Sequence, residues 1–218
     1  PPAAIQAAVE GLTNSYATLH TVLADVESAL PLLREAYAAA AADPAARLCY
    51  AHVLGMLHDP AGAAVLASAV EAGAWDTGWN FRGMGQYGRS VSMMDSYILA
   101  LGRTLDASGV SPVLAKASQL NGGSAFSHIR AVSAALEDLG GGAALSALSA
   151  LLANVRGYAL TNALVAPVIT GYSDTVGDAE RNACLKELAV ARALFRLGDD
   201  AGGNGASVLA QYARDPRE

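Results

Sequence analysis

A leucine-led motif that recurs four times at the ends of helical patterns constrains the fold of this chain more than any other feature. Each copy closes one apolar-periodic segment and is followed by small residues and a second such segment. A two-helix unit cannot bury its apolar face alone, so neighbouring units must stack into a continuous core. The motifs are Leu54-Gly55-Met56-Leu57-His58-Asp59, Leu101-Gly102-Arg103-Thr104-Leu105-Asp106, Leu136-Glu137-Asp138-Leu139-Gly140 and Leu194-Phe195-Arg196-Leu197-Gly198-Asp199, and the segments that follow them are Ala63 to Val70, Val113 to Leu120, Ala143 to Leu152 and Ser207 to Tyr212.

The leading leucines of these motifs are 47, 35 and 58 residues apart. These spacings scatter around the ~40–47 residues of HEAT and armadillo units. We therefore expect an all-α fold, a short right-handed α-solenoid of irregular HEAT-like or armadillo-like helix pairs. The two long spacings locate two inserted loops, at about 74–91 and 155–177. Insertions in solenoids map to loops on one face, which is often the binding face.

Apolar periodicity and capping residues support the helices. Two segments repeat apolar residues at steps of 4, 3 and 4, which is one helix face: Met94, Ile98, Leu101 and Leu105, and Cys184, Leu188, Ala191 and Phe195. A second row in the latter segment predicts a helix covered on more than one side: Val190, Leu194 and Leu197. Three helix starts are predicted where a capping side chain precedes a proline: Asp43-Pro44, Asp59-Pro60 and Ser111-Pro112.

Two regions follow from this organisation. Residues 29–218 are expected to form the HEAT-like repeat domain, and residues 1–28 a helical extension. Within the extension, Ile5 to Val9 and Tyr16 to Val26 have helical patterns. Their register with the later array is not evident, so no repeat is predicted there.

Composition excludes several classes of partner. The net charge of −6 and pI near 5.1 argue against nucleic acid or an anionic membrane, because nothing concentrates Lys and Arg enough to neutralise a row of phosphates. The Ala-rich tracts are interrupted by Asp, Arg or Pro, so no membrane insertion is expected. The sequence predicts a soluble chain without a targeting segment. Because it begins Pro1-Pro2 without methionine, we expect an excised or processed chain.

Cysteine and histidine spacing predicts no metal site. Cys49 and Cys184 lie in apolar helical patterns and form no C-x-x-C, so structural thiols are expected. The histidines lack the H-x-x-x-H and H-E-x-x-H spacings of helical zinc sites, and satisfied core or surface positions are expected for them: His20, His52, His58 and His128.

The first inserted loop contains WDTGWNFRGMGQYGRS, with a literal G-x-G-x-x-G at Gly83, Gly85 and Gly88. A dinucleotide fingerprint needs a preceding strand and a helix that opens directly from the glycines. The residues before Gly83 are Trp-Asn-Phe-Arg, which is not a strand-length apolar run. Asp106 lies at a suitable distance for the ribose, but the end of a repeat helix already explains it. The motif therefore predicts no dinucleotide site.

The same loop is a candidate interaction site. Aromatic residues and arginine are enriched among the residues that dominate interface energies. Either the rings face a protein partner, or they fold inward and cover the edge of the solenoid, and both alternatives remain open. The candidate residues are Trp75, Asp76, Trp79, Asn80, Phe81, Arg82, Gln86, Tyr87 and Arg89.

No catalytic residue is predicted. Ser92 and Asp95 have the S-x-x-D spacing of a capping box that opens the helix carrying Met94 and Ile98. His128 belongs to a helix that starts within Ser124 to His128. A Ser-His-Asp arrangement across the fold stays a minor alternative, because nothing in the sequence selects it.

Several of these stretches resemble the C-terminal HEAT-repeat-like region of a mainly bacterial family of FAD-dependent oxidoreductases. The likeness runs from about Asp25 to Asp215, and it departs at Val155 to Gly177 and at Pro1 to Ala24. The similar stretches are ARLCYAHVLGMLHDPAGAAVLASAV, WDTGWNFRGMGQYGRSVSMMDSYILALGRTLD, SAFSHIRAVSAALE, ERNACLKELAVARALFRLGDD and VLAQYARD, of which the loop and the closing helix are the most specific.

The resemblance implies a helical accessory module. In that family a separate N-terminal domain binds FAD, so the resemblance makes no residue of this chain a flavin ligand. It implies a non-catalytic part of a larger flavoprotein, with the flavin-binding domain as partner. The alternative is a free-standing scaffold subunit of a larger assembly that has lost the enzyme part, and an independent hydrolase is the minor alternative.

Overall fold

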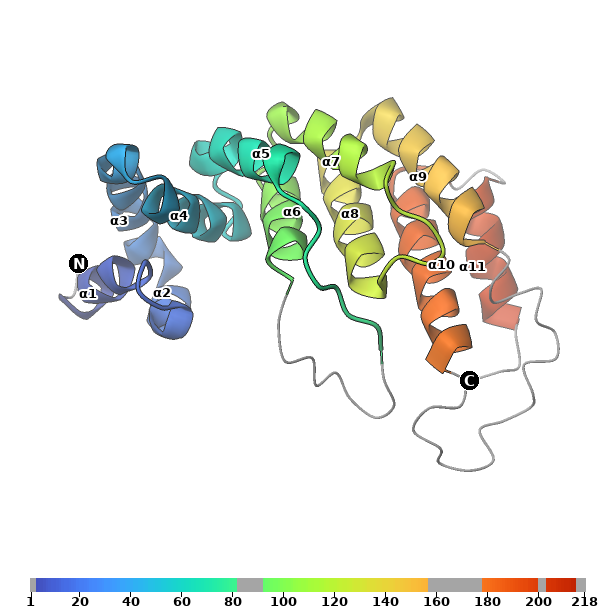
Figure 1. Cartoon of the computed structure of the whole chain (residues 1–218), viewed down its shortest axis with the longest axis horizontal. Helices are drawn as coiled ribbons and strands as arrows, with labels where there is room; N and C mark the ends of the chain where they lie inside the picture. The colour runs from blue at the N-terminus through green and yellow to red at the C-terminus, as the bar shows by residue number, and fades with distance from the viewer. Residues whose placement is uncertain (1–2, 82–91, 157–177, 200–202, 215–218) are drawn as a thin grey trace, which may run out of the picture.

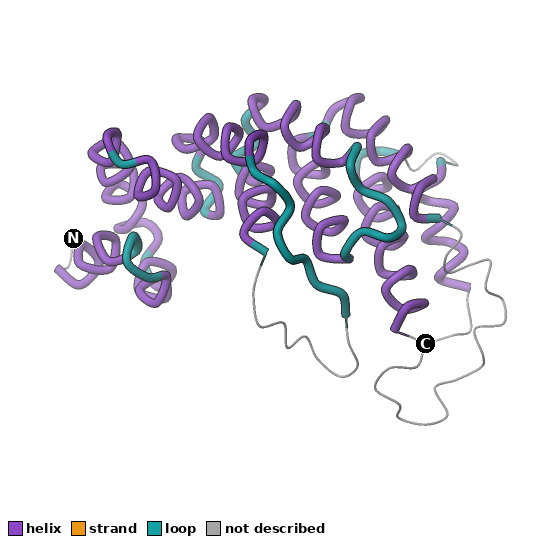
Figure 2. Tube along the Cα trace, viewed as in Figure 1, coloured by secondary structure: helices purple, strands orange, loops and turns teal. Residues whose placement is uncertain are grey.

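The computed structural model describes residues 3–81, 92–156, 178–199 and 203–214, and within these ranges it contains helices and no strand. This confirms the all-α prediction. The helices are α1 (Ala3–Gly11), α2 (Leu19–Ala24), α3 (Val26–Ala39), α4 (Pro44–Met56), α5 (Ala63–Ala72), α6 (Met93–Arg103), α7 (Val110–Ala117), α8 (Phe126–Leu139), α9 (Gly141–Val155), α10 (Asp178–Arg196) and α11 (Asn204–Arg214), with 3-10 turns η1 (Tyr16–Thr18), η2 (Ala40–Ala42), η3 (Pro60–Gly62) and η4 (Ala107–Gly109). Figure 2 shows these helices in purple and the described loops between them in teal.

From α4 onward, successive helices alternate between two layers (Figure 1). One layer consists of α4, α6, α8 and α10, each packed against the next, and the other consists of α5, α7 and α9. Contacts between α5 and α6, α7 and α8, and α9 and α10 join the layers, and α11 packs against α10. In this view α6, α8 and α10 all begin along the lower edge of the molecule.

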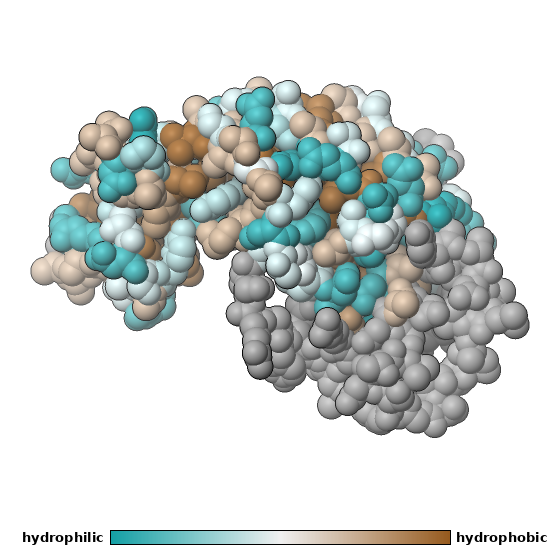
Figure 3. Space-filling model, viewed as in Figure 1, coloured by the Kyte–Doolittle hydropathy of each residue, from teal (hydrophilic) through white to brown (hydrophobic). Residues whose placement is uncertain are grey.

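Two clusters of buried apolar side chains hold the chain together. The larger cluster takes residues from α4 through α11, and the smaller one from α1 through α4. Helix α4 belongs to both, since Ala51 lies in the larger cluster and Leu54 in the smaller. In the space-filling view the most apolar residues show mainly near the junction of α4 and α5 and in the seams between helices (Figure 3).

The four leucine-led motifs share one backbone geometry. Each leading leucine is fully buried, and the residue four positions later has a left-handed φ. That conformation ends a helix and favours glycine. The later two motifs have glycine there and the earlier two do not: His58 (63°), Leu105 (57°), Gly140 (72°) and Gly198 (93°).

An aspartate follows the left-handed residue in three of the four motifs and organises the next segment. Its carboxylate accepts a backbone N–H hydrogen bond from a residue that begins the following turn or helix. The pairs are Asp59 with Ala61 (2.9 Å), Asp106 with Ser108 (2.9 Å) and Asp199 with Gly205 (2.8 Å). The repeated motif in the sequence is thus a repeated helix–turn–helix connection in the structure.

Two of the three predicted caps are confirmed and the third is wrong. Asp43 accepts hydrogen bonds from two backbone N–H groups at the start of α4, and Asp59 caps η3, from which α5 continues. Ser111 caps nothing, because α7 already begins at Val110 and Asp106 caps the turn before it. Ser111 is the second residue of α7 and Pro112 the third. The helix accepts Pro112 there because proline is tolerated in the first helical turn.

The apolar rows are confirmed along most of their length, but both last members are exposed. Leu105 follows the end of α6 and is 64% exposed, and Phe195 is 46% exposed. On α10 the second row is the more deeply buried, with Val190 and Leu194 fully inaccessible. The reason is that α8, α9 and α11 all pack against α10 and bury this side of it.

The N-terminal segment is helical as expected, with more breaks than the sequence indicated. The predicted helix over Tyr16 to Val26 is a 3-10 turn, then α2, then a break at Asp25, whose side chain caps α3. None of the described helices is long and apolar enough to cross a bilayer. Helix α9 ends at Val155, and most of the predicted loop at 155–177 lies outside the described residues.

Candidate functional site

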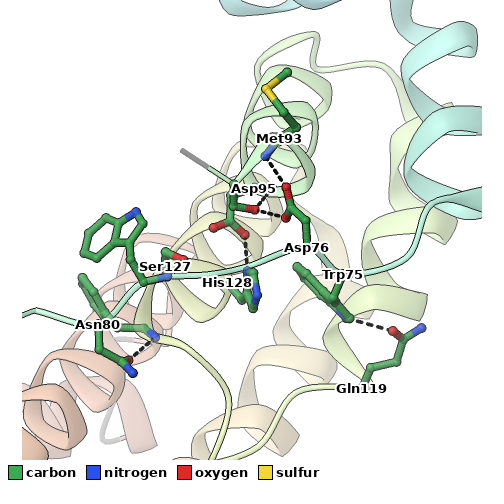
Figure 4. A network of polar contacts seen from close by, with 11 residues as sticks. Trp75, Asp76, Asn80, Met93, Asp95, Gln119, Ser127 and His128 are labelled. Atoms are coloured by element: carbon green, nitrogen blue, oxygen red, sulfur yellow. Dashed lines mark hydrogen bonds and ion pairs between the residues drawn. The ribbon is translucent and has the colours of Figure 1, made fainter. Parts of the chain in front are cut away.

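Residues 73–81, which we call the strap, connect α5 to the far side of the even-numbered layer. The strap runs along the edge where α6, α8 and α10 begin, and it contacts each of them through polar groups. Figure 4 shows the contacts with α6 and α8. It contains five of the nine candidate interaction residues, Trp75, Asp76, Trp79, Asn80 and Phe81. The other four candidates, Arg82, Gln86, Tyr87 and Arg89, and the glycines of the G-x-G-x-x-G lie outside the described residues.

Asp76 completes the N-terminal cap of α6. Its Oδ1 accepts a hydrogen bond from the Ser92 hydroxyl (2.5 Å), and its Oδ2 accepts one from the backbone N–H of Met93 (2.6 Å). Burial acts to raise the pKa of Asp76, but these bonds and one from the Met94 N–H outweigh it, so the pKa lies below its usual range. The Ser92 hydroxyl oxygen also accepts from the Asp95 N–H (3.0 Å), as the capping box predicted.

Asn80 and Trp79 supply the missing cap of α8. Ala125, the N-cap residue of this helix, has no side-chain acceptor to offer. Asn80 Oδ1 accepts from the Phe126 N–H (2.9 Å), and the Trp79 carbonyl accepts from the Ser127 N–H (3.0 Å). In return, the Trp79 N–H donates to the Ser127 hydroxyl (3.0 Å). Two orphan donors at the start of the helix are therefore satisfied by the strap.

The strap ends against α10 through one amide side chain. The Phe81 N–H donates to Asn182 Oδ1 (2.7 Å), and Asn182 Nδ2 donates to the Phe81 carbonyl (2.9 Å). A side-chain amide that pairs with both groups of one backbone residue fixes its position and direction. The strap thus crosses three successive helices of one layer and is fixed to each.

The three aromatic rings of the strap are half-buried on these helices. The Trp75 ring lies 4.4 Å from the His128 ring, its Nε1 donates to Gln119 (2.9 Å), and the Lys116 ammonium sits 5.3 Å from the ring centroid. Trp79 packs edge-to-face on Phe126, with the ring centroids 5.4 Å apart. Of the two alternatives for these rings, inward packing is therefore observed, while part of each ring remains accessible.

Lys116 and Lys186 are buried lysines that hold loops in place. The Lys116 ammonium donates to the carbonyl of Gly73, where the strap begins (2.5 Å), and Lys186 donates to the carbonyl of Gly122 in the loop between α7 and α8 (2.9 Å). Burial lowers the pKa of both ammonium groups. Each carbonyl is therefore the polar partner of a charge that water reaches poorly.

Beneath the strap, Asp95 and His128 form a buried pair, with Asp95 Oδ1 2.6 Å from Nδ1 of His128. Asp95 Oδ2 is buried without a hydrogen bond among the described residues. The imidazole packs against the strap at Gly78, where a Cβ would lie 2.6 Å from Nε2. A side chain at this position would therefore push the strap off the helix.

The pair is not part of an assembled Ser-His-Asp site in the described residues. The Ser92 hydroxyl donates to Asp76, and the Ser127 hydroxyl accepts from Trp79, so both are used in capping contacts. A nucleophilic serine needs its hydroxyl within hydrogen-bond reach of the histidine. The geometry supports a structural role for both serines. The described residues also contain no cluster of three or more His, Cys, Asp or Glu that could hold a metal ion.

The two cysteines are half-buried, and the four histidines are held by hydrogen bonds. Cys49 and Cys184 are both half-buried and are not joined by a disulfide. All four histidines form hydrogen bonds, with His52 and His128 buried and His20 and His58 exposed.

Sequence reasoning missed the residues that receive the strap, which lie on α7, α8 and α10 and just after the end of α7. They are Lys116, Gln119, Ser127, His128 in its pairing with Asp95, and Asn182. One signal was available for α8, because a helix that begins Ala125-Phe126 without a capping side chain needs an acceptor from elsewhere. Nothing comparable marks Asn182, which lies within α10 among ordinary helix formers.

Comparison with known proteins adds no relative, since no family model, curated protein or solved structure matches the chain.

Replacing Asn80 with alanine is expected to lower the free energy of unfolding by about 1 kcal/mol, because the Phe126 N–H loses its acceptor. Urea denaturation followed by circular dichroism measures the change. Asn14→Ala is the matched control, since this asparagine is exposed and its side chain contacts no described partner by a hydrogen bond. Equal midpoints for the two variants would show that the strap does not cap α8.

Proposed function

We propose that this chain is a non-catalytic helical-repeat module that serves interdomain or protein–protein contact. In this proposal it corresponds to the C-terminal region of the FAD-dependent oxidoreductases that it resembles, and FAD belongs to a separate domain. The observation that carries the proposal is the strap, in which a dedicated set of polar contacts holds an aromatic segment across the starts of three helices. A loop that many hydrogen bonds hold at one edge is typical of a loop whose position matters to a partner.

The repeat architecture that we propose is a short right-handed α-solenoid of HEAT-like pairs. Two observations support it: the alternation of helices between two layers, and the four helix ends that share a buried leucine and a left-handed residue four positions later. Stacked units of this kind present long surfaces to partners, with insertions gathered on one side.

The part of the surface that suits a partner best is the contact patch, which consists of Trp79, Phe81, Phe126, Arg130 and Arg181. The Arg181 guanidinium lies 5.0 Å from the centroid of the Phe81 ring, and Arg130 is exposed one helical turn after Phe126. Neither arginine forms an ion pair with a carboxylate among the described residues. Aromatic rings beside guanidinium groups favour a partner surface that carries carboxylates.

A charge reversal at Arg130 tests this proposal, because that side chain is exposed and supports no described contact. Arg130→Glu is expected to weaken binding to the flavin-binding domain from the same genome about thirtyfold, the loss typical of an interface arginine. Isothermal titration calorimetry measures the dissociation constant. Arg214→Glu, an exposed arginine at the end of α11, is the control and is expected to leave binding unchanged.

Two results would contradict the proposal: no association of the native chain with that domain, or the same loss for both variants. Isolation of the chain in a stable, colourless assembly of other subunits would instead favour the free-standing scaffold. Gel filtration with detection at flavin wavelengths separates the two cases, because only the first complex absorbs in the visible.

A further inference from the structure

The loop between α7 and α8 contains one of two Asn-Gly pairs in the chain, Asn121-Gly122, and the other is Asn204-Gly205. An asparagine side chain before glycine can be attacked by the next backbone nitrogen, because glycine has no Cβ to block the approach. The reaction needs an accessible asparagine and a following N–H that is not held in a hydrogen bond. Both asparagines are exposed, so the two pairs differ in the second respect.

Asn121 meets these conditions. It is exposed, and its Oδ1 accepts a hydrogen bond from the Gly123 N–H (2.8 Å), which folds the side-chain carbonyl over the Gly122 peptide and withdraws electrons from Cγ. The Gly122 N–H donates to none of the described residues. The backbone nitrogen next to the activated carbon is therefore available.

Asn204 fails the second condition, although it is exposed and its sequence neighbour is the same. It is the first residue of α11, and the Gly205 N–H donates to Asp199 Oδ2 (2.8 Å). Gly205 is also buried against Leu194 and Ala191. Attack at Asn204 requires this helix start to open first, so the folded structure protects it.

We propose that Asn121 is a site of spontaneous deamidation and isoaspartate formation, and that this modification loosens the connection between α7 and α8. The Gly122 nitrogen forms a bond to Asn121 Cγ while ammonia leaves, which gives a five-membered succinimide. Solvent water then opens the ring at either carbonyl and leaves aspartate or isoaspartate. The overall change exchanges ammonia for water, and nothing is oxidised or reduced.

The modification has a structural consequence because the neighbouring carbonyl has a buried partner. The Gly122 carbonyl accepts from the ammonium of Lys186, which is only 7% exposed. Isoaspartate adds one main-chain carbon at position 121 and so displaces this carbonyl. The buried ammonium then loses the acceptor that compensates its burial, which destabilises the modified chain.

Incubation of the purified chain in mildly alkaline buffer tests the proposal. Peptide mapping by mass spectrometry, with isoaspartyl methyltransferase labelling, is expected to show modification at Asn121 at least about tenfold faster than at Asn204, because the helical amide must open before it reacts. In guanidinium chloride, where the helix is lost, the two rates are expected to become similar. Equal rates in the native chain, or faster modification of Asn204, would overturn the proposal.

The Asn121→Gln variant separates the chemistry from the structural consequence. Glutamine keeps the amide but forms the cyclic intermediate much more slowly. After the same incubation the native chain is expected to lose thermal stability, and the variant to keep its original melting temperature. An aged native chain that is modified at Asn121 but melts as before would refute the predicted loosening of the loop.

Discussion

Gly102→Ala is expected to lower the free energy of unfolding by about 3 kcal/mol, although alanine is the better helix former. Gly102 lies where α6 crosses α8, and a Cβ on it would lie 2.5 Å from Cα and 2.7 Å from Cβ of Ala135. One is a backbone atom of α8 and the other is bonded directly to it, so neither can move aside by rotation of a side chain. The helices must move apart, and the packing of the larger cluster suffers around them.

Gly142→Ala is the matched control for this substitution. Gly142 lies in the first turn of α9, is exposed, and has open space where its Cβ would be. The variant is expected to be more stable than the native chain by about 0.5 kcal/mol, because the unfolded chain loses conformational freedom. Chemical denaturation of the three proteins measures both changes. A Gly102→Ala protein as stable as the Gly142→Ala protein would show that α6 and α8 do not pack as closely as described.

The helices could be predicted from the sequence because their signals are local. The buried leucines at the helix ends, the aspartates before prolines and the apolar steps of three and four residues each act within one or two turns. Errors arose where tertiary packing decides. The steps that place Leu105 on the buried face of α6 continue past the end of the helix, and the left-handed residue there turns the side chain outward. Local spacing does not reveal that reversal.

The candidate site was predictable in part. Composition selected the strap residues, and the S-x-x-D spacing located the cap of α6. The sequence could not reveal that Asp76 and Asn80 serve as caps for helices that begin 17 and 46 residues later. Polar residues in a loop have the same composition whether they contact a partner or their own chain, and only the fold distinguishes the two uses.

Lowering the pH from 7 to 4 is expected to reduce the free energy of unfolding by about 3 kcal/mol through His52 alone. His52 is 7% exposed on α4, between the Tyr16 hydroxyl (2.9 Å from Nδ1) and the Ser96 hydroxyl (2.7 Å from Nε2). Burial lowers its pKa to about 4. The residue therefore links the N-terminal segment to α6 as a neutral imidazole.

The sign follows from the two states of His52. In the unfolded chain its pKa is about 6.5, so between pH 6.5 and 4 the unfolded chain binds a proton that the folded chain does not. The stability contributed by the neutral form is fully present above about pH 6.5 and is lost as the pH falls toward 4.

Urea denaturation at a series of pH values measures this change in stability. In His52→Gln, whose side chain does not titrate, the loss of stability between pH 7 and 4 is expected to be smaller by the same ~3 kcal/mol. His20→Gln is the control for the replacement of an exposed histidine. The contrary outcome is a His52→Gln protein that loses the same stability at every pH and keeps the pH dependence of the native chain. The imidazole would then have to be accessible to protons in the folded chain, and the closed link between the N-terminal segment and α6 would be wrong.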